Sequence, residues 1–161
     1  MVWIISIVLA VIFAFAIVVF FGAPYLPTLK PQINTAFELL DLEAGQTLLE
    51  LGCGDGRVLI AAAERGLKAV GYELNPFLAL LAWLRTRRYG DLVTVKCRNF
   101  WLEKWPEADG IFVFLHTRFM PKLDRKVKNE SRRPLKVVSF AFRIPERKMV
   151  DEKNGLFLYE Y

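Results

Sequence analysis

The sequence predicts an α/β fold with a mainly parallel sheet, preceded by one transmembrane helix at the N-terminus. Three observations lead to this prediction: a β-α-β pattern with a glycine-rich turn over residues 47–76, further apolar runs of strand length after it, and an uncharged apolar stretch at the start. The 161 residues suffice for one globular domain. We expect an anchor over residues 1–22, a connector over 23–34 and one domain over 35–161.

The β-α-β unit of residues 47–76 is the central feature of the chain. Residues 47–51 form a short apolar run typical of a buried strand, and the alanine-rich residues 57–65 favour a helix. Residues 68–74 form a second apolar strand, which ends at the carboxylate of Glu73. Such a unit binds a nucleotide-like ligand at the carboxyl ends of its strands. We therefore expect the ligand site at that edge of the sheet.

The glycine spacing indicates the type of ligand. Gly52, Gly54 and Gly56 stand at every second position, unlike the G-x-G-x-x-G of dinucleotide sites or the G-x-x-x-x-G-K-[ST] of phosphate loops. Glycine tolerates a positive φ and lets the backbone approach a ligand closely. The acids before and inside the turn, Glu50 and Asp55, would repel a phosphate and suit a cationic or amino-bearing ligand.

Glu73 completes this pattern. A carboxylate at the end of the second strand is placed to accept hydrogen bonds from both hydroxyls of a ribose. A nucleoside with a cationic amino-acid arm fits all these features, and S-adenosylmethionine is that molecule. A dehydrogenase site and a glycine-rich structural turn are the alternatives.

With its acid, three glycines and Glu73, the stretch resembles the class I, seven-strand S-adenosylmethionine-dependent methyltransferases, which have a Rossmann-like sheet. The strings PYLPT, ELGCGDGRVLIAAA, GYELNP, NFW and FVFLHTRFMPKL narrow the resemblance. They look like the membrane-anchored protein-lysine methyltransferases related to those that modify the adenine nucleotide translocase and the ATP synthase c subunit. This resemblance implies N-methylation of a lysine in a membrane protein, by in-line displacement at the sulfonium methyl and without a metal.

The resemblance also implies residue roles. The three glycines would shape the cofactor cleft, Glu50 and Asp55 would face the methionine end, and Glu73 would hold the ribose. Asn99 would read the adenine amino group, with a plain turn residue as the alternative. The candidates for cofactor binding are Tyr25, Thr28, Glu50, Gly52, Cys53, Gly54, Asp55, Gly56, Glu73, Leu74, Asn99 and Phe100.

Like Asn99, three further candidates have an alternative interpretation. Tyr25 and Thr28 would close the cleft from the connector, unless residues 22–31 are only a proline-stiffened linker. Phe100, or its neighbour Trp101, could stack on adenine, although aromatic residues near a sheet edge are more often part of the core.

The catalytic residue is left unassigned, with His116 as the candidate. It is the only histidine, and it follows the apolar strand predicted over residues 110–115. A histidine there could act as general base. A packing or hydrogen-bonding histidine is the alternative. The sequence also departs from the family pattern at His116-Thr117, where an apolar residue or proline is expected.

Residues 2–21 are apolar apart from Ser6 and carry no charge. Twenty helical residues span roughly 30 Å, about the thickness of a hydrocarbon core. A cleaved signal peptide and a buried core helix are the alternatives. All 22 Lys and Arg follow this stretch, beginning at Lys30, so the positive-inside bias places the domain on the cytoplasmic or mitochondrial matrix side.

The remaining chain supplies the other elements. We expect a helix over 34–42 with Thr35 as a cap, and a helix over 77–89 whose terminal arginines offset the helix dipole and contact solvent. The further strands are predicted at 93–99, 110–115, 136–143 and, antiparallel, 156–161. About a dozen residues separate the last two strands, too few for a crossover helix plus an extra strand. The C-terminal end of the fold is therefore expected to be trimmed.

The composition gives no reason to expect nucleic acid or a metal as a partner. A net charge of +5 without a basic stripe gives no reason to expect nucleic acid. Cys53 and Cys97 lack metal-ligand spacing and imply no disulfide framework. Two other functions stay open beside lysine methylation: methylation of a small lipophilic substrate such as a quinone or lipid, and a non-catalytic S-adenosylmethionine-binding module.

Overall fold

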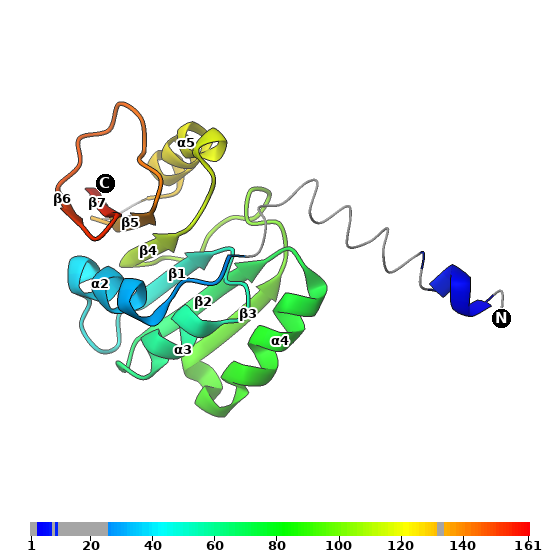
Figure 1. The fold of residues 1–161 in the computed structure, drawn as a ribbon. Coiled ribbons are helices and arrows are strands. Elements are labelled where there is room, and N and C mark those ends of the chain that lie inside the picture. Colours follow the sequence, from blue (N-terminus) through cyan, green and yellow to red (C-terminus); the bar gives the residue numbers. More distant parts are fainter. Residues whose placement is uncertain (1–2, 8, 10–25, 132–133) are drawn as a thin grey trace.

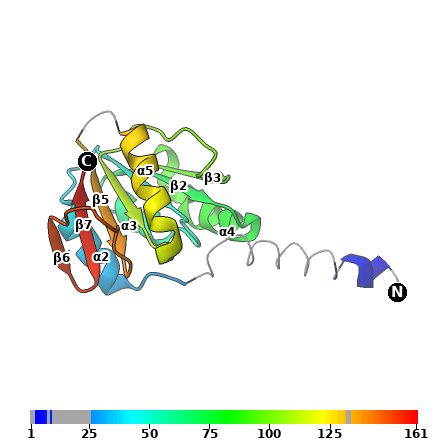
Figure 2. The same ribbon diagram turned by 90° about the horizontal axis from the view of Figure 1, so that it is seen from above.

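The computed structural model describes residues 3–7, 9, 26–131 and 134–161. Its centre is one seven-stranded sheet in the order β3-β2-β1-β4-β5-β7-β6, with helices on both faces (Figure 1 and, from above, Figure 2). The first five strands pair in parallel, and β7 is antiparallel to both neighbours. The strands are β1 (Thr47–Leu51), β2 (Lys68–Glu73), β3 (Val93–Cys97), β4 (Gly110–Val113), β5 (Lys136–Phe140), β6 (Asp151–Lys153) and β7 (Leu156–Glu160).

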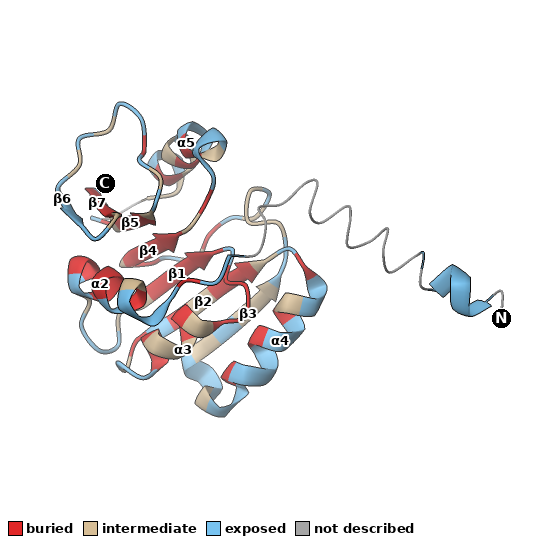
Figure 3. Cartoon of the chain, viewed as in Figure 1, coloured by how far each residue is buried: buried red, intermediate tan, exposed pale blue. Residues whose placement is uncertain are grey.

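The helices bury the two faces of this sheet. The α-helices are α2 (Lys30–Leu40), α3 (Arg57–Ala63), α4 (Pro76–Thr86) and α5 (Met120–Glu130), and the 3-10 helices are η1 (Arg87–Leu92) and η2 (Thr117–Phe119). Alternate strand residues face opposite ways. Leu48 and Phe112 therefore join a core with α2 and α3, whereas Leu49 and Ile111 join one with α5. The central strands β1, β4 and β5 are accordingly mostly buried, whereas the edge strand β3 is partly exposed (Figure 3).

The predicted α/β sheet is confirmed, but the expectation of no extra strand near the C-terminus is wrong. β6 is a strand of three residues that forms a hairpin with β7. Asn154 and Gly155 make the turn with φ of 53° and 76°, and Asn-Gly is the preferred pair for such a turn. A hairpin needs no crossover helix, and residues 141–150 contain none.

The start of α2 also differs from the prediction. The helix begins at Lys30, four residues earlier than expected, because Pro31 is favourable in a first turn. Thr35 therefore lies inside the helix, where its hydroxyl donates to the Pro31 carbonyl at 3.1 Å instead of capping the N-terminus. The connector overlaps this helix.

The segment predicted to cross the membrane, residues 2–21, lies mostly outside the described residues. Residues 3–7 and 9 are helical. In the described ranges, none of the helices has the length and apolar character needed to span a bilayer.

Candidate functional site

The glycine turn joins β1 to α3 at the carboxyl edge of the sheet. Gly52, Gly54 and Gly56 all have positive φ, at 92°, 53° and 78°, which disfavours any larger residue. A Cβ at Gly52 would meet no atom within 4 Å, so the backbone there borders open space. At Gly56 a Cβ would lie 3.1 Å from the Cβ of Ala82, so this glycine also permits α3 to approach α4.

Hydrogen bonds to the end of β2 fix the shape of this turn. Gly52 and Cys53 both donate their amide hydrogens to the Tyr72 carbonyl at 2.9 Å. Gly71 faces the turn from β2, where a Cβ would lie 2.8 Å from the Cys53 sulfur. Burial, followed by the charges of Glu50 and Glu73, raises the pKa of the Cys53 thiol, so it stays protonated. Cys53 thus packs against β2, and sequence analysis overlooked Gly71.

Glu50 is a buried carboxyl group with an unused acceptor. It is 4% exposed, and its Oε2 accepts no hydrogen bond from any described residue. Burial raises the pKa of Glu50 well above its ordinary value, and the nearby charges of Asp55 and Glu73 raise it further. A buried polar atom without a partner is costly. The site is therefore suited to a ligand that brings a cationic donor to Glu50.

Glu73 is held firmly at the end of β2. Its Oε2 accepts from the Gly54 amide at 2.9 Å, and its Oε1 accepts from the Asn75 amide at 2.8 Å. A carboxylate oxygen can accept more than one hydrogen bond, so both oxygens keep capacity for ligand hydroxyls. Asn75 in turn caps α4 by accepting from the Phe77 amide at 2.9 Å, and Leu74 between them is 40% exposed.

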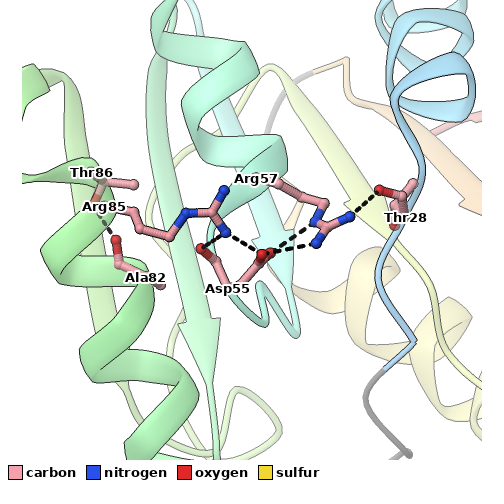
Figure 4. A network of polar contacts seen from close by, with 6 residues as sticks. All are labelled: Thr28, Asp55, Arg57, Ala82, Arg85 and Thr86. Atoms are coloured by element: carbon pink, nitrogen blue, oxygen red, sulfur yellow. Dashed lines mark hydrogen bonds and ion pairs between the residues drawn. The ribbon is translucent and has the colours of Figure 1, made fainter.

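Asp55 lies between two arginines (Figure 4). Arg57 Nε and Nη2 each donate to its carboxylate at 2.9 Å, and Arg85 reaches it from α4. Burial alone would raise the pKa of Asp55, but the hydrogen bonds and charges of the arginines hold it below its ordinary value. Arg85 lies in the last turn of α4 with its side chain 39% exposed, as expected, but its ion pair with Asp55 was not predicted. The predicted place of Asp55 at the methionine end stays a prediction.

The same network fastens the connector to the site. Thr28 is 5% exposed, and its carbonyl accepts from Arg57 Nη1 at 3.2 Å (Figure 4). Thr28 is thus brought to the glycine turn, whereas Tyr25 lies outside the described residues.

Replacing Arg85 by alanine is expected to lower the free energy of unfolding by about 1 kcal/mol, since a partly exposed ion pair contributes little more. Urea denaturation would measure this. Because the pKa of Asp55 is lowered, its contribution is present above its ordinary value of 3.8 and is lost as the pH falls. The difference from the wild type should therefore shrink in acid.

Arg88→Ala is the matched control, because the Arg88 side chain is 67% exposed and lies 3.8 Å from Glu64. We expect it to change stability by less than about 0.5 kcal/mol. Equal losses in the two variants would contradict a specific contribution of Arg85.

Asn99 and Phe100 follow β3 at the same edge. Asn99 Oδ1 accepts from the Trp101 amide at 3.0 Å, and the Phe100 carbonyl accepts from Trp105 Nε1 at 2.9 Å. The Phe100 and Trp101 rings pack against each other with their centroids 4.6 Å apart. Asn99 thus makes the local contact of a turn residue, and contact of these side chains with adenine stays a prediction.

An aromatic cluster lies at the carboxyl ends of β4 and β5. Phe114 follows Val113, the partner of Leu51 in β1, so it borders the glycine turn. Its ring centroid lies 4.6 Å from that of Phe140 and 6.3 Å from that of Phe142. His116 is exposed, lies 5.5 Å from Phe142, and accepts from the Arg118 amide at 3.3 Å through Nδ1. This histidine caps η2, and its role as a base stays a prediction.

Comparison with known proteins agrees with this geometry. A family described as the ANTKMT methyltransferase domain matches residues 50–151, from Glu50 to the first residue of β6. The chain belongs to this family. A protein-lysine N-methyltransferase of Saccharolobus islandicus is 30% identical, with 75% of this chain and 78% of that protein aligned.

Two mammalian relatives are longer proteins. The human lysine N-methyltransferase of the ATP synthase c subunit is 32% identical over 124 residues, which are 76% of this chain and 53% of that protein. The mouse adenine nucleotide translocase lysine N-methyltransferase is 34% identical over an alignment that covers 76% of this chain and 54% of that protein. The chain therefore spans about half the length of these relatives.

Solved structures share the fold. An RNA methyltransferase from Salinibacter ruber in complex with S-adenosyl-L-homocysteine superposes with a TM-score of 0.74 at 28% identity, covering 84% of this chain and 92% of that one. A methyltransferase from Geobacter sulfurreducens superposes with a TM-score of 0.61 at 20% identity, covering 78% of this chain and 54% of that one. At this identity the likeness shows the fold alone. The sheet is therefore that of a Rossmann-like methyltransferase.

Proposed function

We propose that the chain is an S-adenosylmethionine-dependent methyltransferase that N-methylates a lysine in a membrane protein. The observation that carries the proposal is Glu50, a buried carboxyl group beside the glycine turn with an acceptor oxygen that no described residue uses. The family match and the lysine methyltransferases among the relatives support the reaction and the type of acceptor.

The residues present fit S-adenosylmethionine. Glu50 Oε2 would accept from the amino group of the methionine end, and the open space beside Gly52 admits the ligand. Glu73, already oriented by two backbone amides, would accept from the ribose hydroxyls. When bound, the cofactor supplies a methyl group on a positively charged sulfur, which is a good leaving group. No covalent bond to the protein is then required.

The chain has two remaining tasks: to align the lysine and to keep its amine neutral. Phe114, Phe140 and Phe142 offer an apolar surrounding next to the turn, and such a surrounding favours the neutral amine over the ammonium. Correct alignment alone provides a large part of the rate. His116 is the candidate for taking the proton.

We also propose that residues 2–21 anchor the protein in a membrane, with the domain on the cytoplasmic or mitochondrial matrix side. The uncharged apolar stretch and the position of all 22 Lys and Arg after it support this topology. Intracellular S-adenosylmethionine is available on that side.

A small lipophilic substrate is the second candidate. One observation favours it: Phe114, His116, Phe140 and Phe142 form a cluster of aromatic side chains. A quinone or lipid would fit such a surface, and a membrane anchor would serve it equally well.

Transfer of a radiolabelled methyl group from S-adenosylmethionine into host membranes tests the proposal. We expect label in a protein band after solvent extraction, absent with Glu73→Ala, and mass spectrometry would then identify the lysine. Label in the extracted lipid would support the second candidate. Label in RNA, or cofactor binding without any transfer, would contradict both.

A further inference from the structure

Helix α4 presents its large apolar side chains to the outside. Its buried residues are small, Ala79, Ala82 and Thr86, and they face the sheet and the glycine turn. Five large apolar residues remain exposed by 42% to 59%: Phe77, Leu80, Leu81, Trp83 and Leu84. Four of them follow the i, i+3, i+4, i+7 spacing of a single helix face. The outer surface of α4 is accordingly coloured as exposed in Figure 3.

Other apolar residues before α4 in the chain are exposed as well. Leu74, just before the helix, is 40% exposed, and the connector residues Leu26 and Leu29 are each 60% exposed. At the other end of the helix, Arg87 and Arg88 are exposed. Exposed apolar patches of this kind mark interaction sites. An apolar helix face with arginines at its border is typical of a helix that lies in a membrane interface.

The connector limits the distance between α4 and the apolar N-terminal stretch. Thr28 is bonded to Arg57, Arg57 to Asp55, and Asp55 to Arg85 of α4 (Figure 4). The apolar stretch ends at residue 21, five residues before Leu26. Five extended residues reach at most about 18 Å. A bilayer that holds residues 2–21 is thus within about 18 Å of Leu26.

We infer that the apolar face of α4 rests on the lipid bilayer, with Phe77, Leu80 and Leu84 in the interface and Arg87 and Arg88 beside anionic headgroups. The inference depends on the proposed membrane attachment through residues 2–21. Because α4 begins directly after Glu73 and Asn75, this placement brings the cofactor edge of the sheet close to the membrane surface. A lysine at the membrane surface would then lie within reach of the site.

Quenching of Trp83 by lipid tests this placement. The full chain, with Trp3→Phe and Trp101→Phe to remove emission from the N-terminal stretch and from the cofactor edge, is reconstituted into vesicles of zwitterionic and anionic lipids with brominated acyl chains. We expect strong quenching that disappears when Trp83→Phe is added. Trp105→Phe is the matched control, because Trp105 is 7% exposed in the core on the α5 side of the sheet and should leave the quenching unchanged.

A second pair of variants tests the apolar face directly. Leu80→Glu combined with Leu84→Glu should abolish the quenching of Trp83 while the protein still sediments with the vesicles through residues 2–21. Leu102→Glu, on a residue 82% exposed outside α4, should leave the quenching intact.

Two fluorescence results would overturn the inference. If Trp83 is shielded from both lipid bromine and aqueous iodide, the face is covered by protein, either the N-terminal stretch itself or a second copy of the chain. If iodide reaches Trp83 in the vesicles, the face is open to solvent. Failure to sediment with vesicles would instead remove the membrane attachment, and with it the inference, while methyl transfer would still be measured separately.

Discussion

Replacing Glu50 by glutamine is expected to weaken binding of S-adenosylmethionine by about 100-fold, because losing a hydrogen-bonded charge pair in a buried site costs about 2–3 kcal/mol. The same change should stabilise the unbound protein. Glu50 has no donor for Oε2 among the described residues, and burial together with the charges of Asp55 and Glu73 outweighs the positive charge of Arg57. Its ionised form is therefore unfavourable until a cationic donor binds. An opposite effect on binding and on stability distinguishes a ligand-binding carboxylate from a structural one.

The pH dependence follows from the raised pKa of Glu50. The folded, unbound protein favours the protonated carboxyl, so this contribution to stability is fully present below the ordinary value of 4.5 and is lost as the pH rises through the folded pKa. The stability advantage of Glu50→Gln should therefore be small near pH 4.5 and grow above it. Binding a cationic amine requires the carboxylate, so cofactor affinity should rise with pH over the same window in the wild type only.

Calorimetric titration with S-adenosylmethionine at several pH values, together with thermal unfolding of the unbound protein, would measure both effects. Glu64→Gln is the matched control, because Glu64 has a carboxylate side chain that is 55% exposed. It should change neither quantity. If Glu50→Gln binds the cofactor as tightly as the wild type, Glu50 does not contact the cationic end of the ligand.

The short-range pattern of the sequence predicted the two strands and the glycine turn between them. β1 and β2 are apolar runs bounded by turn residues, and Glu73 lies at the end of β2, so its proximity to the glycine turn followed from the parallel pairing alone. Thr28 could be assigned to the site only by resemblance, because its contact with Arg57 is made by a backbone carbonyl. A backbone contact leaves no residue pattern.

The sequence did not predict contacts between distant residues or which side of α4 is buried. Asp55 and Arg85 are 30 residues apart, and no periodicity links a turn acid to an arginine on a later helix. Residues 77–84 of α4 are all apolar, and hydrophobicity alone does not tell which side of the helix faces the sheet. The close approach of Gly56 to Ala82 decides this, because only small side chains fit there and the large ones must face outward.

The second large effect is expected for Glu73→Ala, which should weaken binding of S-adenosylhomocysteine by at least about 100-fold, since two hydrogen bonds to a charged acceptor are lost. The ribose hydroxyls are the proposed donors. The wild type should therefore bind the 2′,3′-dideoxy analogue about 100-fold more weakly than S-adenosylhomocysteine. Glu73→Ala should bind the two ligands about equally.

Glu73 also accepts from the amides of Gly54 and Asn75, so Glu73→Ala could weaken binding by disordering the turn. A matched variant distinguishes this effect from loss of the contact with the ribose. Asn75→Ala removes the cap of α4 and should cost about 1 kcal/mol of stability, yet it leaves the carboxylate in place. It should therefore keep the preference for the ribose hydroxyls. Loss of that preference in Asn75→Ala would make order of the turn the cause. A preference retained in Glu73→Ala would mean that another residue binds the ribose.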